Sequence, residues 1–274
     1  MSLDPALAQL EKLGEGREAE VFAWSEGRAL RLFRDGFARD VEHERLAVAA
    51  ARAGRIPTPL LHELLRVAGR EGVVLDRVDG ETQLELVGRK PWFLLREARR
   101  TGRLHARLHA LVAPAGLQSL QERVRERIEH ARAPGRLAAI ALKAMADLPS
   151  ASQLCHGDYH PGNLLVEASG RHVVIDWGGA SAGPAEADVA RTIVLLRLGT
   201  PDDPSPAIRV IARFARRLLI TGYLRGYRSV TKLDESLLWR WIAVRAVDRL
   251  ADPVEDPMAG TEALIAEAQE RAGV

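Results

Sequence analysis

The fold is decided by residues 154–166, which read Leu-Cys-His-Gly-Asp-Tyr-His-Pro-Gly-Asn-Leu-Leu-Val, and by residues 172–178, which read His-Val-Val-Ile-Asp-Trp-Gly. Two short aliphatic runs flank an Ala-Ser-Gly turn, a pattern typical of a β-hairpin. Polar side chains stand at both ends of it: Asp158 and Asn163 before the first strand, and Asp176 after the second. The hairpin therefore gathers these side chains into one small volume.

This set offers only oxygen ligands, two carboxylates and an amide. Such a set suits Mg²⁺ and suits a thiophilic or imidazole-binding metal poorly. The order His156-x-Asp158-x-x-x-x-Asn163, followed by Asp176-x-Gly178, matches the phosphoryl-transfer signature of kinases. In that template the first Asp orients the acceptor hydroxyl, and the Asn and the second Asp bind the metal ions.

The pattern His-Gly-Asp-x-x-x-x-Asn with Ile-Asp-Trp downstream resembles the aminoglycoside phosphotransferase and choline kinase-like enzymes, where protein kinases have His-Arg-Asp and Asp-Phe-Gly. The resemblance spans about Leu10 to Tyr227, and the central hairpin is its specific part. It implies an α+β, protein-kinase-like fold of two lobes. We expect a small antiparallel-sheet N-lobe with one helix at residues 1–79, and a larger, mostly helical C-lobe at residues 80–274 that contains the catalytic loop, the metal site and the acceptor pocket.

Composition bounds the other classes of function. The chain has 274 residues, 47% of them hydrophobic and 28% charged, which is enough for a two-lobed globular protein. A net charge of +2 gives no indication of a nucleic-acid or membrane partner. The single cysteine, Cys155, excludes an internal disulfide and fits a reducing compartment. The sequence shows neither a signal-peptide pattern nor an apolar run of about 18 residues, so we expect a cytoplasmic protein.

Residues 10–33 are expected to form strands around a glycine loop. Gly14 and Gly16 precede the second strand and resemble the nucleotide-covering loop of kinases, in which backbone N–H groups approach phosphate oxygens. Ala19 replaces the third glycine of that pattern. A Gly-x-Gly before a strand is also common in plain turns, so the pair is ambiguous by itself.

The resemblance places Arg31 where the third strand of the family carries a lysine that contacts the α- and β-phosphates. Arginine keeps the charge but has a planar fork, so the exchange is not neutral, and a solvent-facing arginine is the alternative. An Ala-rich helix follows at residues 38–53. Its Glu44 is expected to form an ion pair with Arg31, with Glu42 as the near competitor and a merely solvated carboxylate as the third interpretation.

A second hairpin is expected from Leu60–Val67 and Val73–Arg77. The residues that follow resemble the hinge between kinase lobes. Backbone groups at about Asp76 to Val78 would then bind the adenine edge of ATP. Backbone recognition leaves little trace in side-chain identity.

Two features of the helical remainder have competing interpretations. His105 and His109 lie four apart on one predicted helix face, the spacing of a zinc pair, but no glutamate general base lies between them, so hydrogen-bonded interior histidines are favoured. Buried packing is likewise favoured for Cys155. The resemblance implies that Asp188 braces the catalytic loop, whereas a first-turn acid interacting with the helix dipole is the alternative.

The C-terminal helices are expected at 206–227, 234–250 and 261–272. Four aromatic residues there could face an acceptor, because aromatic rings bind quaternary ammonium groups, but core packing explains them at least as well: Tyr223, Tyr227, Trp239 and Trp241. Acids from Asp248 to Asp256 could attract a polycationic acceptor or could be simply solvated.

The resulting hypothesis is transfer of the γ-phosphoryl group from ATP, with Mg²⁺, to a hydroxyl of a small molecule. Asp158 would orient and deprotonate the hydroxyl, and Asn163 and Asp176 would bind Mg²⁺. One alternative is a non-catalytic nucleotide-binding module, suggested by Arg31 and Ala19. Another is a metal-dependent phosphoesterase, suggested by an Asp-x-His element, although the further ligand motifs of such enzymes are missing.

Overall fold

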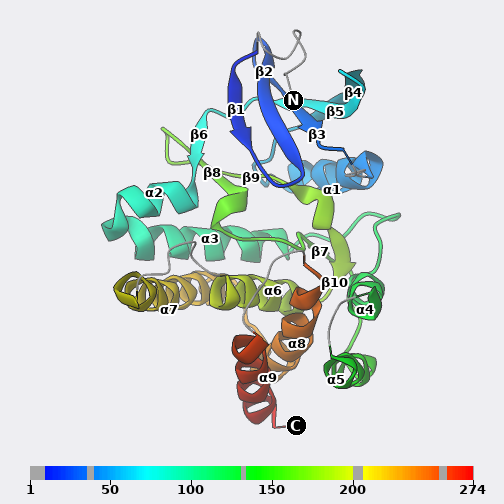
Figure 1. Ribbon diagram of the computed structural model, residues 1–274, viewed down its shortest axis with the longest axis vertical. Coiled ribbons are helices and arrows are strands. Elements are labelled where there is room, and N and C mark those ends of the chain that lie inside the picture. The colour runs from blue at the N-terminus through cyan, green and yellow to red at the C-terminus, as the bar shows by residue number, and fades with distance from the viewer. Residues whose placement is uncertain (1–9, 36–39, 131–133, 200–205, 253–257, 274) are drawn as a thin grey trace.

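The computed structural model describes residues 10–35, 40–130, 134–199, 206–252 and 258–273. An antiparallel sheet with one helix lies at one end of the long axis, and most helices lie at the other (Figure 1). The predicted α+β architecture, with a small N-terminal sheet and a helical C-terminal part, is confirmed. No described helix is long and apolar enough to cross a membrane.

The N-terminal sheet has five antiparallel strands in the order β1-β2-β3-β5-β4. Glycines in the left-handed region close its two tight turns, at Gly27 (φ 68°) and Gly69 (φ 76°). One apolar cluster of the sheet is formed by Phe22, Leu30 and Val74 with their neighbours. The strands are β1 (Lys12–Glu15), β2 (Ala19–Ser25), β3 (Arg28–Phe33), β4 (Leu61–Val67) and β5 (Arg70–Asp76).

Helix α1 (Val41–Ala53) is the one helix that accompanies this sheet. The side chain of Asp40 caps it by accepting the backbone N–H of His43 at 3.0 Å. Its small buried residues Ala47 and Ala51 let it approach the main core closely. Gly54 caps the end of the helix, and a Cβ there would displace the Leu111 side chain.

Two small sheets carry the central motif. The predicted hairpin is formed, with Leu164 opposite Val174 and Leu165 opposite Val173. It is extended by β6 in a three-stranded sheet of order β6-β8-β9, while β7 pairs with β10. The strands are β6 (Gly80–Thr82), β7 (Gln153–Cys155), β8 (Leu164–Glu167), β9 (His172–Val174) and β10 (Ser181–Gly183).

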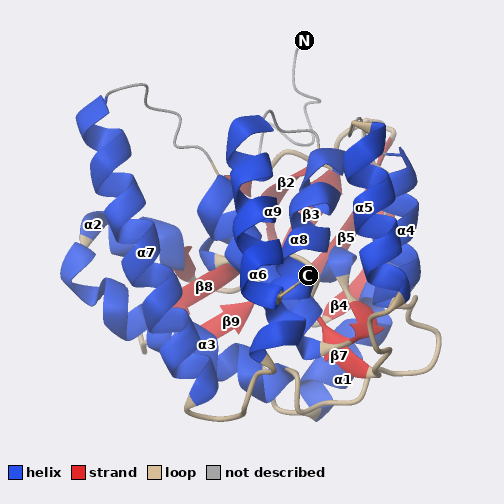
Figure 2. Ribbon diagram, turned by 90° about the horizontal axis from the view of Figure 1, so that it is seen from below, coloured by secondary structure: helices blue, strands red, loops and turns tan. Residues whose placement is uncertain are grey.

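The helices form a layer that lies in front of the strands when the molecule is seen from below (Figure 2). They are α2 (Gln83–Arg89), α3 (Leu94–Leu108), α4 (Leu120–His130), α5 (Gly135–Ala146), α6 (Ala185–Leu198), α7 (Pro206–Arg228), α8 (Glu235–Asp248) and α9 (Met258–Ala272). Short 3₁₀ turns are η1 (Pro91–Phe93), η2 (Pro161–Asn163), η3 (Trp177–Gly179) and η4 (Arg249–Ala251).

Helices α3 and α7 pack against each other at backbone distance. A Cβ on Gly102 would collide with the Tyr223 carbonyl oxygen, and a Cβ on Gly226 would collide with the Arg99 carbonyl oxygen. Because neither glycine can carry a side chain, the two helices keep one fixed register. That register places His105 of α3 and His109, its C-cap, beside residues 223 and 227 of α7.

The aromatic residues weighed as acceptor-binding groups belong mostly to the core. Tyr223, Tyr227 and Trp241 are fully buried. Trp239 is half-buried and lies under the Arg271 guanidinium, whose central carbon is 4.6 Å from the ring centroid. Packing is therefore the structural role of the three buried rings.

Candidate active site

The catalytic loop brings Asp158 and Asn163 into direct contact. The Asn163 side-chain nitrogen donates to the Asp158 carbonyl oxygen at 2.9 Å and to its carboxylate Oδ2 at 3.1 Å. Because the nitrogen makes both bonds, the amide oxygen is the Asn163 atom that can coordinate a cation. The loop turns at Gly157 (φ 82°), where a Cβ would collide with the Gly179 carbonyl oxygen, so the loop lies directly on the turn after Asp176.

Asp158 is a partly exposed carboxylate between two nitrogen donors. His160 Nε2 lies 3.4 Å from Oδ2, and Arg191 Nη2 lies 3.5 Å from Oδ1. The Gly162 N–H donates to His160 Nδ1 at 3.1 Å, so Nε2 of that ring carries a hydrogen. Burial opposes ionisation of Asp158, but His160 and Arg191 outweigh it and lower the pKa of Asp158 well below its ordinary value. The side chain is thus a carboxylate at neutral pH.

Asp176 lies at the end of the hairpin in the left-handed region (φ 64°, ψ 67°), which a short polar side chain tolerates better than most. The residue before it is tied to the catalytic loop, because the Ile175 N–H donates to the Asn163 carbonyl oxygen at 3.0 Å. Asp176 Oδ1 lies 4.0 Å from Arg31 Nη1. The two carboxylates and the amide of the predicted set, Asp158, Asp176 and Asn163, therefore belong to one continuous segment of the chain.

Arg31 forms its ion pair with Glu44. The two guanidinium nitrogens donate to the two carboxylate oxygens, Nη1 to Oε1 at 3.0 Å and Nη2 to Oε2. Glu44 is buried at 2% exposure, whereas Glu42 is 71% exposed and pairs with Arg45. Glu44 Oε1 also accepts the backbone N–H of Trp177 at 3.3 Å. Arg31, Glu44 and the residue after Asp176 thus form one connected chain.

Glu44→Gln is expected to weaken nucleotide binding, because a neutral amide cannot hold both guanidinium nitrogens of Arg31 in place. We expect the dissociation constant for ATP to rise roughly tenfold, equivalent to about 1.4 kcal/mol. Glu42→Gln is the matched control, since its exposed ion pair contributes little. Fluorescence titration with a nucleotide analogue measures both variants, and equal effects of the two would contradict the assigned pairing.

Some backbone N–H groups of the glycine loop and the hinge segment (Asp76–Val78) are hydrogen-bonded within the protein, and others are not. Gly16 donates to the Ala19 carbonyl oxygen at 2.8 Å, and a Cβ on Gly14 would meet nothing within 4 Å. In the hinge segment, Asp76 N–H donates to Leu60 and Arg77 N–H donates to Gly27. Within the described part of the chain, the Val78 N–H donates to no protein acceptor, unlike those of Asp76 and Arg77.

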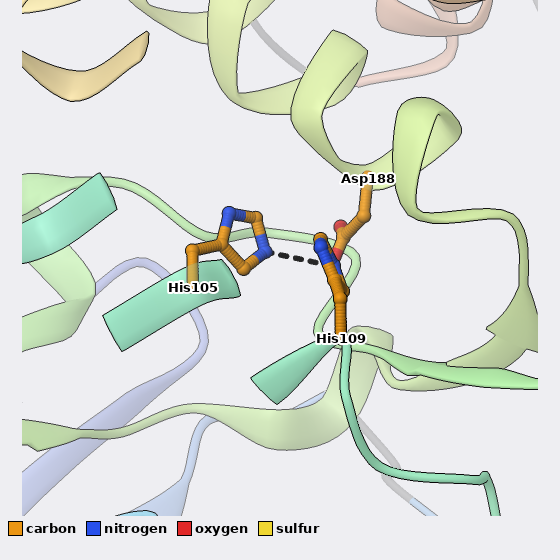
Figure 3. Close-up of side chains that lie close together, drawn as sticks. All are labelled: His105, His109 and Asp188. Atoms are coloured by element: carbon orange, nitrogen blue, oxygen red, sulfur yellow. Dashed lines mark hydrogen bonds and ion pairs between the residues drawn. The ribbon is translucent and has the colours of Figure 1, made fainter. Parts of the chain in front are cut away.

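Asp188 is the buried centre that orders the catalytic loop. Its Oδ2 accepts the backbone N–H of His156 at 2.6 Å, and its Oδ1 accepts that of Gly157 at 2.9 Å. His105 Nε2 and His109 Nε2 lie 3.0 and 3.2 Å from Oδ2 (Figure 3). The expected bracing of the loop is therefore present in the geometry, supported by two imidazole rings.

The same three side chains could be mistaken for a metal site, since their ligand atoms lie within 4.8 Å of one another. The outer nitrogens of His105 and His109 face hydroxyls, at 2.7 Å from Tyr223 and 2.7 Å from Tyr227. Tyrosine O–H groups can donate to these nitrogens while the inner N–H groups donate to Asp188. Every polar atom is then satisfied without a cation, which supports the interior hydrogen-bonded interpretation.

Protonation of the buried histidines is expected to make stability depend on pH. Burial and the neighbouring His109 lower the pKa of His105 from 6.5 to about 3, and burial also lowers the pKa of His156. Below about pH 6.5 the unfolded chain therefore binds more protons than the folded one, and the free energy of unfolding falls as pH falls towards 3.

Urea unfolding at about pH 7, 6 and 5 measures how the free energy of unfolding changes with pH. Carboxylates titrate mainly below this range, so the change reports on the histidines. His105→Gln should flatten it, and the exposed His130→Gln should leave it unchanged. A free energy of unfolding that stays constant over this range in the wild type would contradict the assignment.

Sequence reasoning missed the charged cluster beside Asp158. Arg191 is 7% exposed, and its Nη2 donates to Asp252 Oδ2 at 2.7 Å while also facing Asp158. Asp248 Oδ1 accepts from Arg127 at 2.6 Å. The acids at 248 and 252 are thus already paired with arginines, which removes them as a free attraction for a polycation. Glu255 and Asp256 lie outside the described residues.

The fold, a small antiparallel sheet with one helix beside a mostly helical part, is kinase-like. The family model described as the phosphotransferase enzyme family matches residues 9–232. Because that match covers most of the chain, the protein belongs to this family.

Solved structures agree on the fold. A thermostable mutant of aminoglycoside phosphotransferase APH(4)-Ia, in a ternary complex with ADP and hygromycin B, is 18% identical with a TM-score of 0.64, covering 97% of this chain and 92% of that one. The aminoglycoside-3'-phosphotransferase of type VIII is 20% identical with a TM-score of 0.60 (88% and 93% covered). Choline kinase LicA from Streptococcus pneumoniae is 14% identical with a TM-score of 0.59 (97% and 93% covered). No match was found among curated protein sequences.

Proposed function

We propose that this protein is an ATP- and Mg²⁺-dependent kinase that transfers the γ-phosphoryl group to a hydroxyl of a small molecule. The observation that carries the proposal is the contact of Asn163 with Asp158, together with the backbone hydrogen bond from Ile175, the residue before Asp176, to Asn163. Structures similar in fold were obtained with ADP or AMP-PNP and with hygromycin B, and one is a choline kinase. These ligands indicate the class of nucleotide and acceptor to test.

Asp158 is the group that meets the acceptor. Its ionised carboxylate can accept the hydroxyl hydrogen and direct the oxygen towards the terminal phosphate. His160 and Arg191 keep it ionised and restrain its orientation. The low pKa makes Asp158 a weak base, so its contribution is mainly to orient the hydroxyl, and the proton leaves late in the transfer.

Asn163 and Asp176 would hold Mg²⁺. Their donor set fits this ion, because one amide oxygen and one partly exposed carboxylate leave room for water and phosphate oxygens. When bound, the ion supplies positive charge that neutralises the phosphates. Arg31, fixed by Glu44, adds a second positive charge on the nucleotide side.

The nucleotide would lie between an N-lobe at residues 1–79 and a C-lobe at residues 80–274. Gly14 and Gly16 would cover its phosphates, and the hinge segment would bind its base, with the Val78 N–H as the donor. Asp76 would take part only through its carbonyl, because its N–H and its side chain are engaged elsewhere.

An acceptor screen tests the proposal. Purified protein with ATP and Mg²⁺ is incubated with amino-alcohols, sugars, hydroxy acids and aminoglycosides, and ADP formation is measured. ADP that requires one acceptor class and disappears with EDTA supports the kinase. Nucleotide binding without turnover on any acceptor would support a non-catalytic module, and phosphate release from esters without ATP would support a phosphoesterase.

A further inference from the structure

A second cavity lies apart from the catalytic groups. It has a volume of about 530 Å³ and is lined by the loop after α1, the start of the hinge segment and the β8–β9 turn. Asp158, Asn163 and Asp176 are not among the described residues that line it. We call this cavity the rear groove. Its size is within the range of small-molecule sites, about 300–1,000 Å³.

The rear groove is lined by more positive than negative charge. Its lining residues include four arginines from three segments and one acid; they are Arg52, Arg55, Arg77, Arg171 and Asp76. Outside the lining, Arg77 pairs with Glu11 and Asp79, and Arg171 pairs with Glu167, through partly exposed contacts.

The one carboxylate is already neutralised. Asp76 pairs with Arg28, accepts from His62 Nε2 at 2.8 Å, lies 3.3 Å from Arg52 Nη1 and accepts the Leu60 N–H at 3.0 Å. Its negative charge is therefore shared among several donors, and it leaves little repulsion for an entering anion.

The arginines keep donors for a ligand. Arg77 pairs with Asp79 at 2.7 Å, and Arg171 pairs with Glu167 at 2.9 Å, through partly exposed contacts that an anion can replace. Arg55 has the left-handed backbone conformation (φ 59°), which is unfavourable for a long side chain. No acidic partner is recorded for its side chain within the described residues.

We propose that the rear groove binds a small polyphosphate anion, such as the di- or triphosphate portion of a phosphorylated metabolite. Arginine forks match phosphate oxygens two at a time, and several arginines along one groove favour a multiply charged group over a single carboxylate. The size of the groove favours a small molecule over a nucleic acid or a membrane surface. This site does not depend on the proposed function.

The position of the rear groove couples a bound ligand to the active site through the loop beneath it. The loop under the groove holds the metal-binding hairpin, because Thr58 Oγ1 accepts Trp177 Nε1 at 2.8 Å and the Pro57 carbonyl oxygen accepts the Val174 N–H at 2.8 Å. A bound anion would therefore contact the segment that anchors the residue next to Asp176.

Isothermal titration with inorganic tripolyphosphate, in magnesium-free buffer at about 0.15 M salt, tests the site. The groove variant is Arg55→Gly with Arg171→Gln, since glycine accepts the backbone angle at 55. Arg66→Gln with Arg228→Gln removes the same charge elsewhere on the surface, and Arg31→Gln removes the cation proposed for the ATP phosphates.

We expect at least a tenfold loss of affinity in the groove variant, equivalent to about 1.4 kcal/mol or more, and a change below twofold in the surface control. Absence of binding to the wild type would overturn the proposal. So would a loss of affinity caused by Arg31→Gln but not by the groove variant, because the anion would then occupy the catalytic site.

Discussion

Asp158→Asn is expected to lower kcat by roughly 10²-fold or more, because loss of the group that orients the acceptor hydroxyl misplaces the attacking oxygen. The amide keeps the size of the side chain, but its N–H₂ group cannot accept the hydrogen of the substrate hydroxyl. The contact from Asn163 and the ion pair with Arg191 would also lose a charged partner. Initial rates of ADP formation at saturating ATP, with an acceptor found in the screen, measure the effect.

A measurement of ATP affinity separates a loss of catalysis in Asp158→Asn from a general loss of folded structure. Because Asp158 orients the acceptor and not the nucleotide, the dissociation constant for ATP should change less than twofold. Asp147→Asn, an exposed acid at the end of α5, is the matched control and should retain full activity. Retention of more than a tenth of the wild-type rate in Asp158→Asn would rule out the assigned role.

Asp188→Asn is expected to lower the free energy of unfolding by about 3–5 kcal/mol, since removing one partner of a buried charged network leaves the others uncompensated. Four N–H groups point at this carboxylate, and an amide nitrogen would face donors that it cannot bind. For a chain of this size the melting temperature should fall by roughly 10 °C. Urea and thermal unfolding measure the change.

Asp234→Asn provides the comparison, because that residue caps α8 at the surface by accepting the Leu237 N–H, a role that asparagine fills equally well. Its stability should stay within about 0.5 kcal/mol of the wild type. If Asp188→Asn were equally mild, the bracing of the catalytic loop would have to come from other contacts.

The sequence predicted the centre of the molecule better than its periphery. The hairpin and its polar ends are encoded locally, because alternating aliphatic residues, a turn and three oxygen ligands occur within 20 or so residues. Glu44 was the expected partner of Arg31, with Glu42 as the near competitor, and the structure pairs Glu44 with Arg31. Helix α2 was overlooked, although Thr82 and Glu85 form the capping box that announces it.

Other features had no local signal. Strands β7 and β10 are three residues each and pair across a long sequence separation. Arg191 pairs with Asp252, which lies 61 positions away in the sequence, so no periodic pattern could predict the pair. In the hinge segment the recognition groups are backbone atoms, and whether an N–H is already engaged, as for Asp76 and Arg77, depends on tertiary pairing alone.

The absence of side chains at Gly102 and Gly226 has a practical consequence for protein engineering. Any library that randomises either position would recover almost nothing but unfolded variants, because every replacement drives one helix backbone into the other. A designer who wishes to change which alcohol is phosphorylated should leave α3 and α7 untouched at this crossing.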